Sequence, residues 1–554
     1  MIRSVKRYPE LPTPYSMRDW RWVAERYDEL VFDFERRDDF FPVIWWDESD
    51  GRGPSHAFGL PSYVGGIRTG DRHEAINCVA AVLGATLCGR DKRTDRGQNW
   101  VQLCLSYYDE GQHLFLNRRK IRAGSSFWYE IYPHILLYSL VDCYPEESRL
   151  GEIMEVTARE WQKACEALKG TDGVPDFNHV SFDFSTLKPV DNGRWREPDA
   201  AAGVAWLEYM AYMKFGDPIF LQAALDALRF LEHAHENPFY ENLLPFGAFV
   251  AARVNAELGE TFAVERFVNW CFDGDSTARP GWGVIDSRWG DMDCHGLQGS
   301  LTDWGQRWDR LSANASHDAL PSSADGANES GYAFTTNTFC IAGALLPLVR
   351  YDPSFAPDIA RWLLHLANNA RLFYPNALPA KQQSCAFFRS DEDAVIAYEG
   401  LRRKWDYQSP YATGDPIRYS WGSIDLGLYG SSHVGILGGV LIQSEVDGVV
   451  YWDCLKTDYF HQPAFPTYLV YNPHFESVKV GLPMSGLGQN CTVDVYDKLT
   501  HRWLATGSHP DAKLDLGPLQ VAVLVICPVG SELEGSRGKL MANGVTIDFH
   551  YPEG

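Results

Sequence analysis

The sequence lacks the features that would place it in a membrane or among nucleotide-driven enzymes. None of its 554 residues belongs to an apolar run approaching the roughly 20 residues that cross a bilayer. Residues 1–12 contain basic side chains but not the apolar core of a secretory signal. It also has no Gly-rich phosphate loop followed by Lys, no Gly-x-Ser-x-Gly elbow between a strand and a helix, and no His-Glu-x-x-His motif. These absences predict a cytoplasmic protein and disfavour NTPase, serine-hydrolase and zinc-protease chemistry.

Basic residues are fewer than acidic residues in this sequence. Fifty Lys and Arg stand against 73 Asp and Glu, which gives a net charge of −23. A negative field of this size repels phosphate backbones and anionic lipid surfaces, so neither nucleic acid nor a membrane is expected as a partner. A strongly anionic polymer is also disfavoured as a substrate, unless the basic cluster Arg118, Arg119, Lys120 and Arg122 offsets the charge locally.

The spacing of the cysteines does not predict a metal site. The 12 cysteines are scattered, and no close pair repeats at metal-finger spacing. No cofactor is therefore expected.

Aromatic residues make up 14% of the chain, with 19 Trp and 27 Tyr. They fit either a large core or a pocket that stacks sugar rings, because Tyr and Trp combine an apolar body with one polar tip.

The first four-fifths of the chain has the periodicity of paired helices. Apolar residues recur at three- and four-residue spacing, with loops rich in Gly, Pro and Asp between the helical stretches. After a first helix ending near Phe32, helices are predicted over 72–88, 98–109, 126–142, 149–168, 198–214, 218–234, 241–258, 260–272, 331–349 and 353–369. About six helical hairpins predict a closed ring. An open helical superhelix is the main alternative, but no constant repeat length supports it.

The chain changes character after about Pro463. Short β-branched or aromatic runs occur at 467–471, 477–481, 492–496, 514–516, 521–528 and 545–551, with turn residues between them. They predict a small antiparallel sandwich. The predicted fold is mainly α, an (α/α)6 toroid over residues 1–442 followed by a β-sandwich over 443–554.

This order of elements carries a resemblance. The run Tyr-Leu-Val-Tyr-Asn-Pro at 468–473, together with Val493–Asp497 and Val521–Pro528, looks like the terminal β-domain of many glycoside hydrolases. A helical toroid followed by such a domain resembles the six-hairpin glycosidase-like superfamily and the toroid-plus-sandwich polysaccharide lyases. The resemblance implies a carbohydrate substrate. It carries no site residues, because no single family's catalytic signature matches.

The connection from Asp273 to Ser330 is the densest candidate site. It is expected to be irregular, and long ordered connections are usually functional. Aspartates and Trp are what glycoside cleavage requires, since one carboxyl protonates the leaving oxygen while a second activates water or attacks the sugar. Asp291, Asp293 and His295 alternate and would face the same way in an extended segment. They could also ligate a divalent cation, although no further ligand is evident and no metal is assigned. A solvated acidic loop is the alternative. The candidates here are Trp282, Asp286, Arg288, Trp289, Asp291, Asp293, His295, Asp303 and Trp304.

Other candidates lie outside this stretch. Glu329, just before a helix expected near Thr335, is the single best catalytic candidate, and its alternative role is in a helix cap. Glu130 and Glu241, also near helix starts, are expected to cap helices or compensate their dipoles. His433 could equally be a hydrogen-bonded structural residue. With Arg288 and Trp289, the predicted substrate-binding residues are Trp45, Trp46, Tyr332, Trp421, Tyr429 and His433.

These observations favour a glycoside hydrolase that uses carboxylates from Asp291, Asp293 and Glu329, with His295 beside them. A polysaccharide lyase is the alternative enzyme, with Tyr332, His295 or His433 as base and Asn328 or Arg288 stabilising the enolate. A non-catalytic glycan-binding protein is the third hypothesis. In all three the partner is a carbohydrate.

Overall fold

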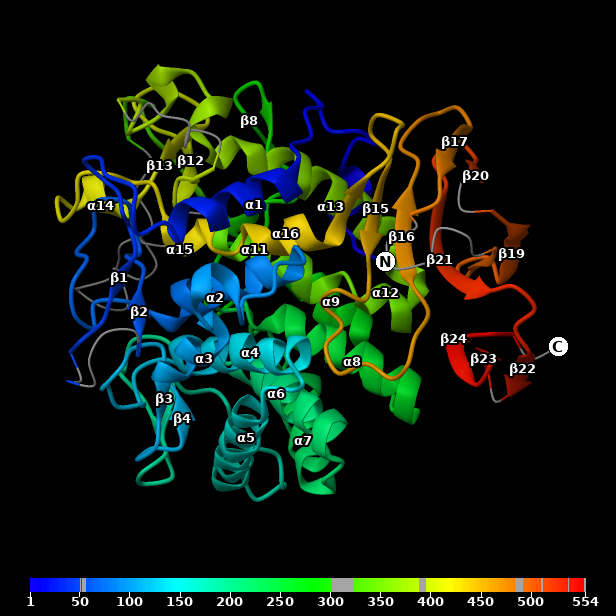
Figure 1. The fold of residues 1–554 in the computed structure, drawn as a ribbon, viewed down its shortest axis with the longest axis horizontal. Helices are drawn as coiled ribbons and strands as arrows, with labels where there is room; N and C mark the ends of the chain where they lie inside the picture. Colours follow the sequence, from blue (N-terminus) through cyan, green and yellow to red (C-terminus); the bar gives the residue numbers. More distant parts are fainter. Residues whose placement is uncertain are drawn as a thin grey trace.

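The computed structural model describes residues 1–49, 51, 56–300, 323–387, 395–483, 492–509, 512–536 and 538–552. Helices form the larger part of the molecule, and the C-terminal strands, orange to red in Figure 1, lie together at one end. In the described residues, no helix is long and apolar enough to cross a membrane.

Within the described residues, six helices contact one another in a closed inner ring. Nearly all their side chains are buried, because these helices are apolar on every side rather than along one stripe. Close approach requires small residues. A Cβ on Gly247 would lie 2.5 Å from the Cβ of Ala202 on the neighbouring helix. The ring consists of α2 (Ala75–Leu87), α4 (Phe127–Cys143), α6 (Ala200–Phe215), α8 (Leu244–Leu258), α11 (Thr335–Leu345) and α16 (Val434–Val440).

A second layer of helices surrounds the ring and precedes each inner helix in the chain. Most of these outer helices bury one face against the ring and expose the other, whereas the last, Ala356–Asn369, is almost wholly buried because the C-terminal sheet also packs against it. These helices begin at residues that favour helix starts. The side chain of Asp217, for example, accepts a hydrogen bond from the backbone N–H of Ile219 and caps α7. The outer layer consists of α1 (Trp20–Val31), α3 (Trp100–Cys104), α5 (Ser148–Leu168), α7 (Pro218–His233), α9 (Val264–Phe272) and α13 (Ala356–Asn369). The predicted toroid of six hairpins is confirmed, and so is the resemblance at the level of the fold.

The prediction that the connection from Asp273 to Ser330 is irregular was wrong for its described parts. They contain short strands, two of which join an antiparallel five-stranded sheet in the order β13-β12-β11-β10-β7. This sheet comprises β7 (Trp282–Val284), β10 (Gln298–Ser300), β11 (Glu329–Phe334), β12 (Gly400–Lys404) and β13 (Tyr411–Thr413). A hairpin of β8 (Arg288–Trp289) and β9 (Met292–Asp293) lies between β7 and β10 in the chain. The candidates Asp303 and Trp304 lie outside the described residues.

The C-terminal sheet lies between the toroid and a small two-stranded sheet. In β16, Leu469 and Tyr471 belong to the toroid core, whereas Tyr468 and Val470 pack with β17 and β20 on the opposite face. The predicted sandwich is therefore confirmed. Its main sheet runs β14 (Leu441–Gln443), β15 (Val450–Asp453), β16 (Thr467–Tyr471), β21 (Val521–Pro528), β18 (Val493–Asp497) and β19 (Arg502–Ser508). The opposing pair is β17 (Val478–Gly481) and β20 (Lys513–Leu516), and a third sheet holds β22 (Leu533–Ser536), β23 (Lys539–Ala542) and β24 (Val545–Asp548). The predicted domain boundary at residue 443 falls at the end of β14.

Candidate active site at the N-terminal ends of the inner helices

A cavity of about 530 Å³ opens where inner helices begin. Glu74 precedes α2, Trp128 and Tyr129 lie in the first turn of α4, and Glu241 precedes α8. A cavity of this size suits a small organic ligand. The remaining lining residues are Ser62, Tyr63, Arg118, Ser126, Tyr240, Arg279, Phe334, Thr336, Asn337, Glu399, Asp415, Trp421, Gly427, Tyr429 and Gly430.

Aromatic side chains form much of the wall. Trp421 is 57% exposed, and its ring meets Tyr63 edge to face at a centroid distance of 5.2 Å. Burial, together with nearby carboxylates, raises the pKa of Tyr129 and of Tyr240. These phenols therefore keep their protons and are suited to donating hydrogen bonds rather than to acting as bases.

Glu241 is held as a carboxylate on one wall. Asn337 Nδ2 donates to its Oε1 at 2.9 Å, and the Arg279 guanidinium pairs with its Oε2. Arg279 is almost wholly buried and lies 3.6 Å above the ring centre of Trp282, whose indole N–H donates to the Glu241 carbonyl at 2.7 Å. A fixed, buried cation beside a carboxylate favours its ionised form.

Glu399 lies in a different environment. Its Oε1 accepts from the Tyr63 hydroxyl at 2.5 Å, and its Oε2 accepts from the Tyr332 hydroxyl at 3.3 Å. The backbone N–H of Asp415 donates to the same Oε2 at 2.7 Å. Burial and the carboxylates of Glu399 and Asp415 raise the pKa of Tyr63 well above its ordinary value. The side chain of Asp415 lines the same cavity as Glu399.

A second cavity of about 470 Å³ shares Tyr63, Glu74, Arg118 and Trp421 with the first. Arg118 Nε donates to Glu74 Oε1 at 2.8 Å, so this ion pair stands in the wall common to both cavities. The two together extend the space beyond what a single small ligand fills.

Buried acids support the cavity from behind. Glu197 accepts from the Ser126 hydroxyl at 2.9 Å, the Trp128 N–H at 2.9 Å and the Trp195 indole at 3.0 Å. Burial raises the pKa of Glu197 to about 8 and that of Asp199 to about 7, despite their hydrogen bonds. Glu197 therefore fixes the start of α4, where Trp128 faces the cavity.

Of the two alternative roles expected for Glu241, helix capping was wrong, because Asp199 accepts the N–H groups of Glu241 and Leu243 before α8. Compensation of the helix dipole by Glu241 stays a prediction. Glu130 does accept backbone N–H groups near the start of α4, from Gly124 at 2.6 Å and Ser125 at 3.0 Å.

Four of the predicted site residues lie in or beside the cavity. Trp421 and Tyr429 line it, and Tyr332 contacts Glu399. His433 lies behind Tyr429, with Nδ1 3.0 Å from the Tyr429 carbonyl oxygen and its ring stacked on Tyr132.

Glu329, Trp45 and Trp46 are not among the described residues that line this cavity. Glu329 is 2.9 Å from Lys404 Nζ and 3.5 Å from Arg403 Nε, on the outside of the β11–β12 pair. The indole of Trp45 donates to the Gly70 carbonyl at 3.0 Å, and Trp46 stacks parallel to Trp100. No contact described here tests their predicted roles, which stay predictions.

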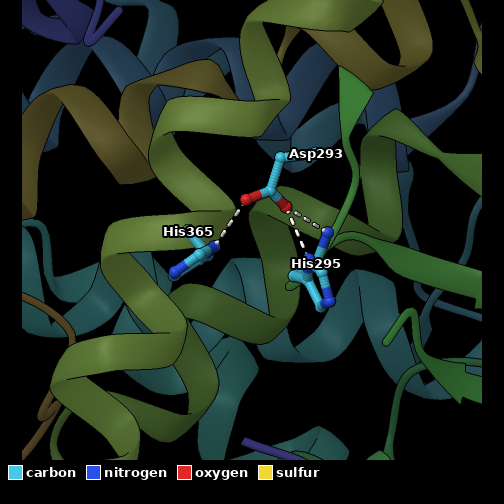
Figure 2. A group of neighbouring side chains, drawn as sticks. All are labelled: Asp293, His295 and His365. Atoms are coloured by element: carbon cyan, nitrogen blue, oxygen red, sulfur yellow. Dashed lines mark hydrogen bonds and ion pairs between the residues drawn. The ribbon is translucent and has the colours of Figure 1, made fainter. Parts of the chain in front are cut away.

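The alternating trio does not act as one group. Asp293 and His295 meet His365 from α13 (Figure 2), with Asp293 Oδ1 2.7 Å from His295 Nδ1 and Oδ2 3.2 Å from His365 Nδ1. Asp291 is exposed, and its carbonyl accepts from Arg288. None of these residues, nor the buried Trp289, is among the described residues that line the cavity.

Sequence reasoning missed Glu74, Arg279, Glu399 and Asp415. Glu74 carries a usable signal, because it stands directly before an almost wholly apolar helix. Glu399 and Asp415 lie around β12 and β13, between α13 and α16, and no local pattern distinguishes them from other loop acids.

No protein-family model matches the sequence, and the search of curated protein sequences gave no match. Among solved structures, a cellobiose 2-epimerase from Bacillus thermoamylovorans is 6% identical, with a TM-score of 0.42 over 76% of this chain and 98% of that one. A D-mannose isomerase is 10% identical, with a TM-score of 0.41 over 76% and 99%. An inactive α-1,6-mannanase variant from Salegentibacter sp., in complex with α-1,6-mannotriose, is 10% identical, with a TM-score of 0.37 over 76% and 98%. At these TM-scores, none of the named activities extends to this chain.

Proposed function

We propose that this protein is a glycoside hydrolase that cleaves an oligosaccharide bound in the cavity, with Glu241 and Glu399 as the carboxylate pair. The observation that supports this most directly is the presence of two carboxylates in contrasting environments within one aromatic cavity. Glycoside cleavage uses two carboxyl groups whose protonation states differ.

Glu241 suits the ionised role. Its contact with Arg279 favours the charged form, so it can attack the anomeric carbon or accept a proton from water. Asn337 fixes the direction of the other oxygen.

Glu399 suits the role of proton donor. It shares the cavity with the acid Asp415, and the Tyr63 hydroxyl holds its Oε1 in place. The exposed ring of Trp421 offers a face for a sugar, as aromatic side chains do at carbohydrate sites.

A lyase is less well supported, because β-elimination needs a base that removes a carbon-bound proton. The raised pKa values of Tyr63, Tyr129 and Tyr240 make their phenols poor bases. Elimination is therefore an outcome of the test rather than a second proposal.

The test incubates the protein with neutral and uronate-containing oligosaccharides and follows reducing ends and unsaturated-uronate absorbance together. We expect new reducing ends without absorbance. Glu241→Gln and Glu399→Gln should each lower kcat by about 10²–10⁴-fold, whereas Glu152→Gln on the outer helix α5 should leave kcat unchanged. Glu329→Gln tests the candidate from sequence in the same assay.

Three results would contradict the proposal. Rising absorbance would establish elimination, and conversion of the reducing-end sugar without chain cleavage would establish an isomerase or epimerase. Saturable binding of a glycan with no turnover would leave a binding protein.

A further inference from the structure

A cluster outside the cavity has the donor set of a metal site. Asp293 ends β9, His295 follows two residues later, and His365 lies on α13, so two separate segments converge (Figure 2). One carboxylate oxygen and one nitrogen from each imidazole lie within 4.8 Å of one another. The cluster is not among the residues that line the proposed active site, so it is independent of that proposal.

The histidine orientations leave two ring nitrogens facing the carboxylate. His365 Nε2 is 2.8 Å from the Pro9 carbonyl oxygen, which can only accept, so this nitrogen carries the proton. In the neutral His365 ring this places the Nδ1 lone pair toward Asp293 Oδ2. His295 Nδ1 lies at hydrogen-bond distance from Asp293 Oδ1, 2.7 Å, so it donates to the carboxylate when no ion is bound and must release its proton to bind a metal. Metal-bound histidines characteristically donate their other N–H to a carbonyl or carboxylate in this way.

The carboxylate is fixed on one side and unsatisfied on the other. Asp293 Oδ1 accepts from the His295 backbone N–H at 2.9 Å and from Asn369 Nδ2 at 3.0 Å. Asp293 Oδ2 and His365 Nδ1 are buried, lie 3.2 Å apart and make no hydrogen bond. Two facing acceptors repel each other unless a cation lies beside both. Their separation is close to the roughly 3.3 Å edge of a tetrahedron with ligand distances of about 2.0 Å.

We propose that Asp293, His295 and His365 bind a divalent transition-metal ion, with zinc as the expected occupant. Two imidazoles and a carboxylate suit zinc better than calcium or magnesium, which prefer all-oxygen sites. The ion joins the β9 segment to α13 and, through Pro9 and the Tyr8 ring that packs on both histidines, to the N-terminal segment.

The test uses the full chain depleted of metal with a chelator and titrated with Zn²⁺ by calorimetry. We expect saturable binding of one equivalent and a raised Tm. Co²⁺ in place of Zn²⁺ should give the visible bands of nitrogen and oxygen coordination, without a thiolate charge-transfer band. That absence separates this site from adventitious binding at cysteine.

Three variants test which residues contribute to Zn²⁺ affinity. Asp286→Asn alters the carboxylate that lies 3.6 Å from His295 Nε2 and also pairs with Arg7, and it should weaken Zn²⁺ binding by about 10–100-fold. His295→Asn removes a partly exposed ligand and should weaken it further. His501→Gln is the matched control, because His501 Nδ1 contacts Asp548 Oδ2 at 2.8 Å in the C-terminal region without belonging to the trio. It should leave the affinity unchanged.

Absence of stoichiometric binding by the unaltered protein would overturn the proposal. So would equal affinity in His295→Asn, or a thiolate band in the Co²⁺ spectrum. Because the unaltered chain provides two of these readouts, the stoichiometry and the Co²⁺ spectrum, the test does not depend on whether the buried His365 tolerates substitution.

Discussion

The buried carboxyl of Glu197 makes the stability of the toroid pH-dependent. Burial raises its pKa to about 8 in the folded protein, against 4.5 for an exposed glutamate. Because the folded state holds a proton that the unfolded state has released, stability contributed by this group is fully present below pH 4.5. It is lost as pH rises toward 8. Between pH 5 and pH 8 the loss is roughly 3–4 kcal/mol.

Glu197→Gln should remove this dependence. The amide cannot reproduce all three hydrogen bonds, since its NH2 would oppose either the Trp195 indole or the donors Ser126 and Trp128. The variant therefore begins less stable at pH 5 by about 1–3 kcal/mol. Relative to the unaltered protein, its free energy of unfolding should rise by roughly 3–4 kcal/mol by pH 8, because only the unaltered protein loses the contribution of a buried acid.

The measurement is urea unfolding followed by Trp fluorescence at pH 5 and pH 8 for both proteins. Glu152→Gln, on the solvent-exposed side of α5, controls for the loss of a carboxylate as such. The reasoning is refuted if the free-energy difference between variant and unaltered protein is the same at both pH values. It is also refuted if the variant becomes less stable relative to the unaltered protein as pH rises.

Three further predictions follow from single contacts. Arg279→Met removes the cation beside Glu241, so the acid limb of the pH profile of kcat/KM should move up by about 1–3 pH units; an unmoved limb would mean that Arg279 acts only in binding. Asp458→Asn leaves the buried guanidinium of Arg350 without the carboxylate that pairs with it and removes one of the two carboxylates beside Arg253, so it should cost about 3–5 kcal/mol, measured by urea unfolding; a loss below 1 kcal/mol would contradict this. Gly247→Ala should lower stability by about 1–3 kcal/mol through overpacking against α6, whereas Gly151→Ala, with open space around it, should not.

The toroid could be predicted because its signals are local and repeated. The stretch 198–214 reads as a helix from its apolar spacing, and Gly216-Asp217-Pro218 marks the end of α6 and the start of α7. Gly216 adopts a left-handed backbone, with φ of 71°, that favours glycine. The interval 282–300 was misread because its strands are only two or three residues long, too short for a period of two to show.

The candidate site was less predictable, since its parts are distant in sequence. The acids of the cavity are Glu74, Glu241, Glu399 and Asp415. In the sequence nothing distinguishes them from the other residues among 73 Asp and Glu, and only the closed ring of helices brings them together. The run at 286–295 was predicted as the site because several acidic residues lie close together there in the sequence. Convergence in space is not visible in a sequence, and the same run instead contributes Asp293 and His295 to the cluster completed by His365.

Helix polarity connects the stability of this fold to its proposed chemistry. The N-terminal end of a helix carries a partial positive charge and unpaired N–H groups, so an acid placed just before it is favoured. Glu74, Asp199 and Glu241 occupy such positions before α2, α6 and α8. In a ring whose inner helices start at the same end, this preference gathers carboxylates around one opening without requiring any motif. An acid within three residues before a wholly apolar helix, such as Glu74 before α2 or Glu241 before α8, is therefore a better guide to the candidate site of this toroid than the local density of acidic residues.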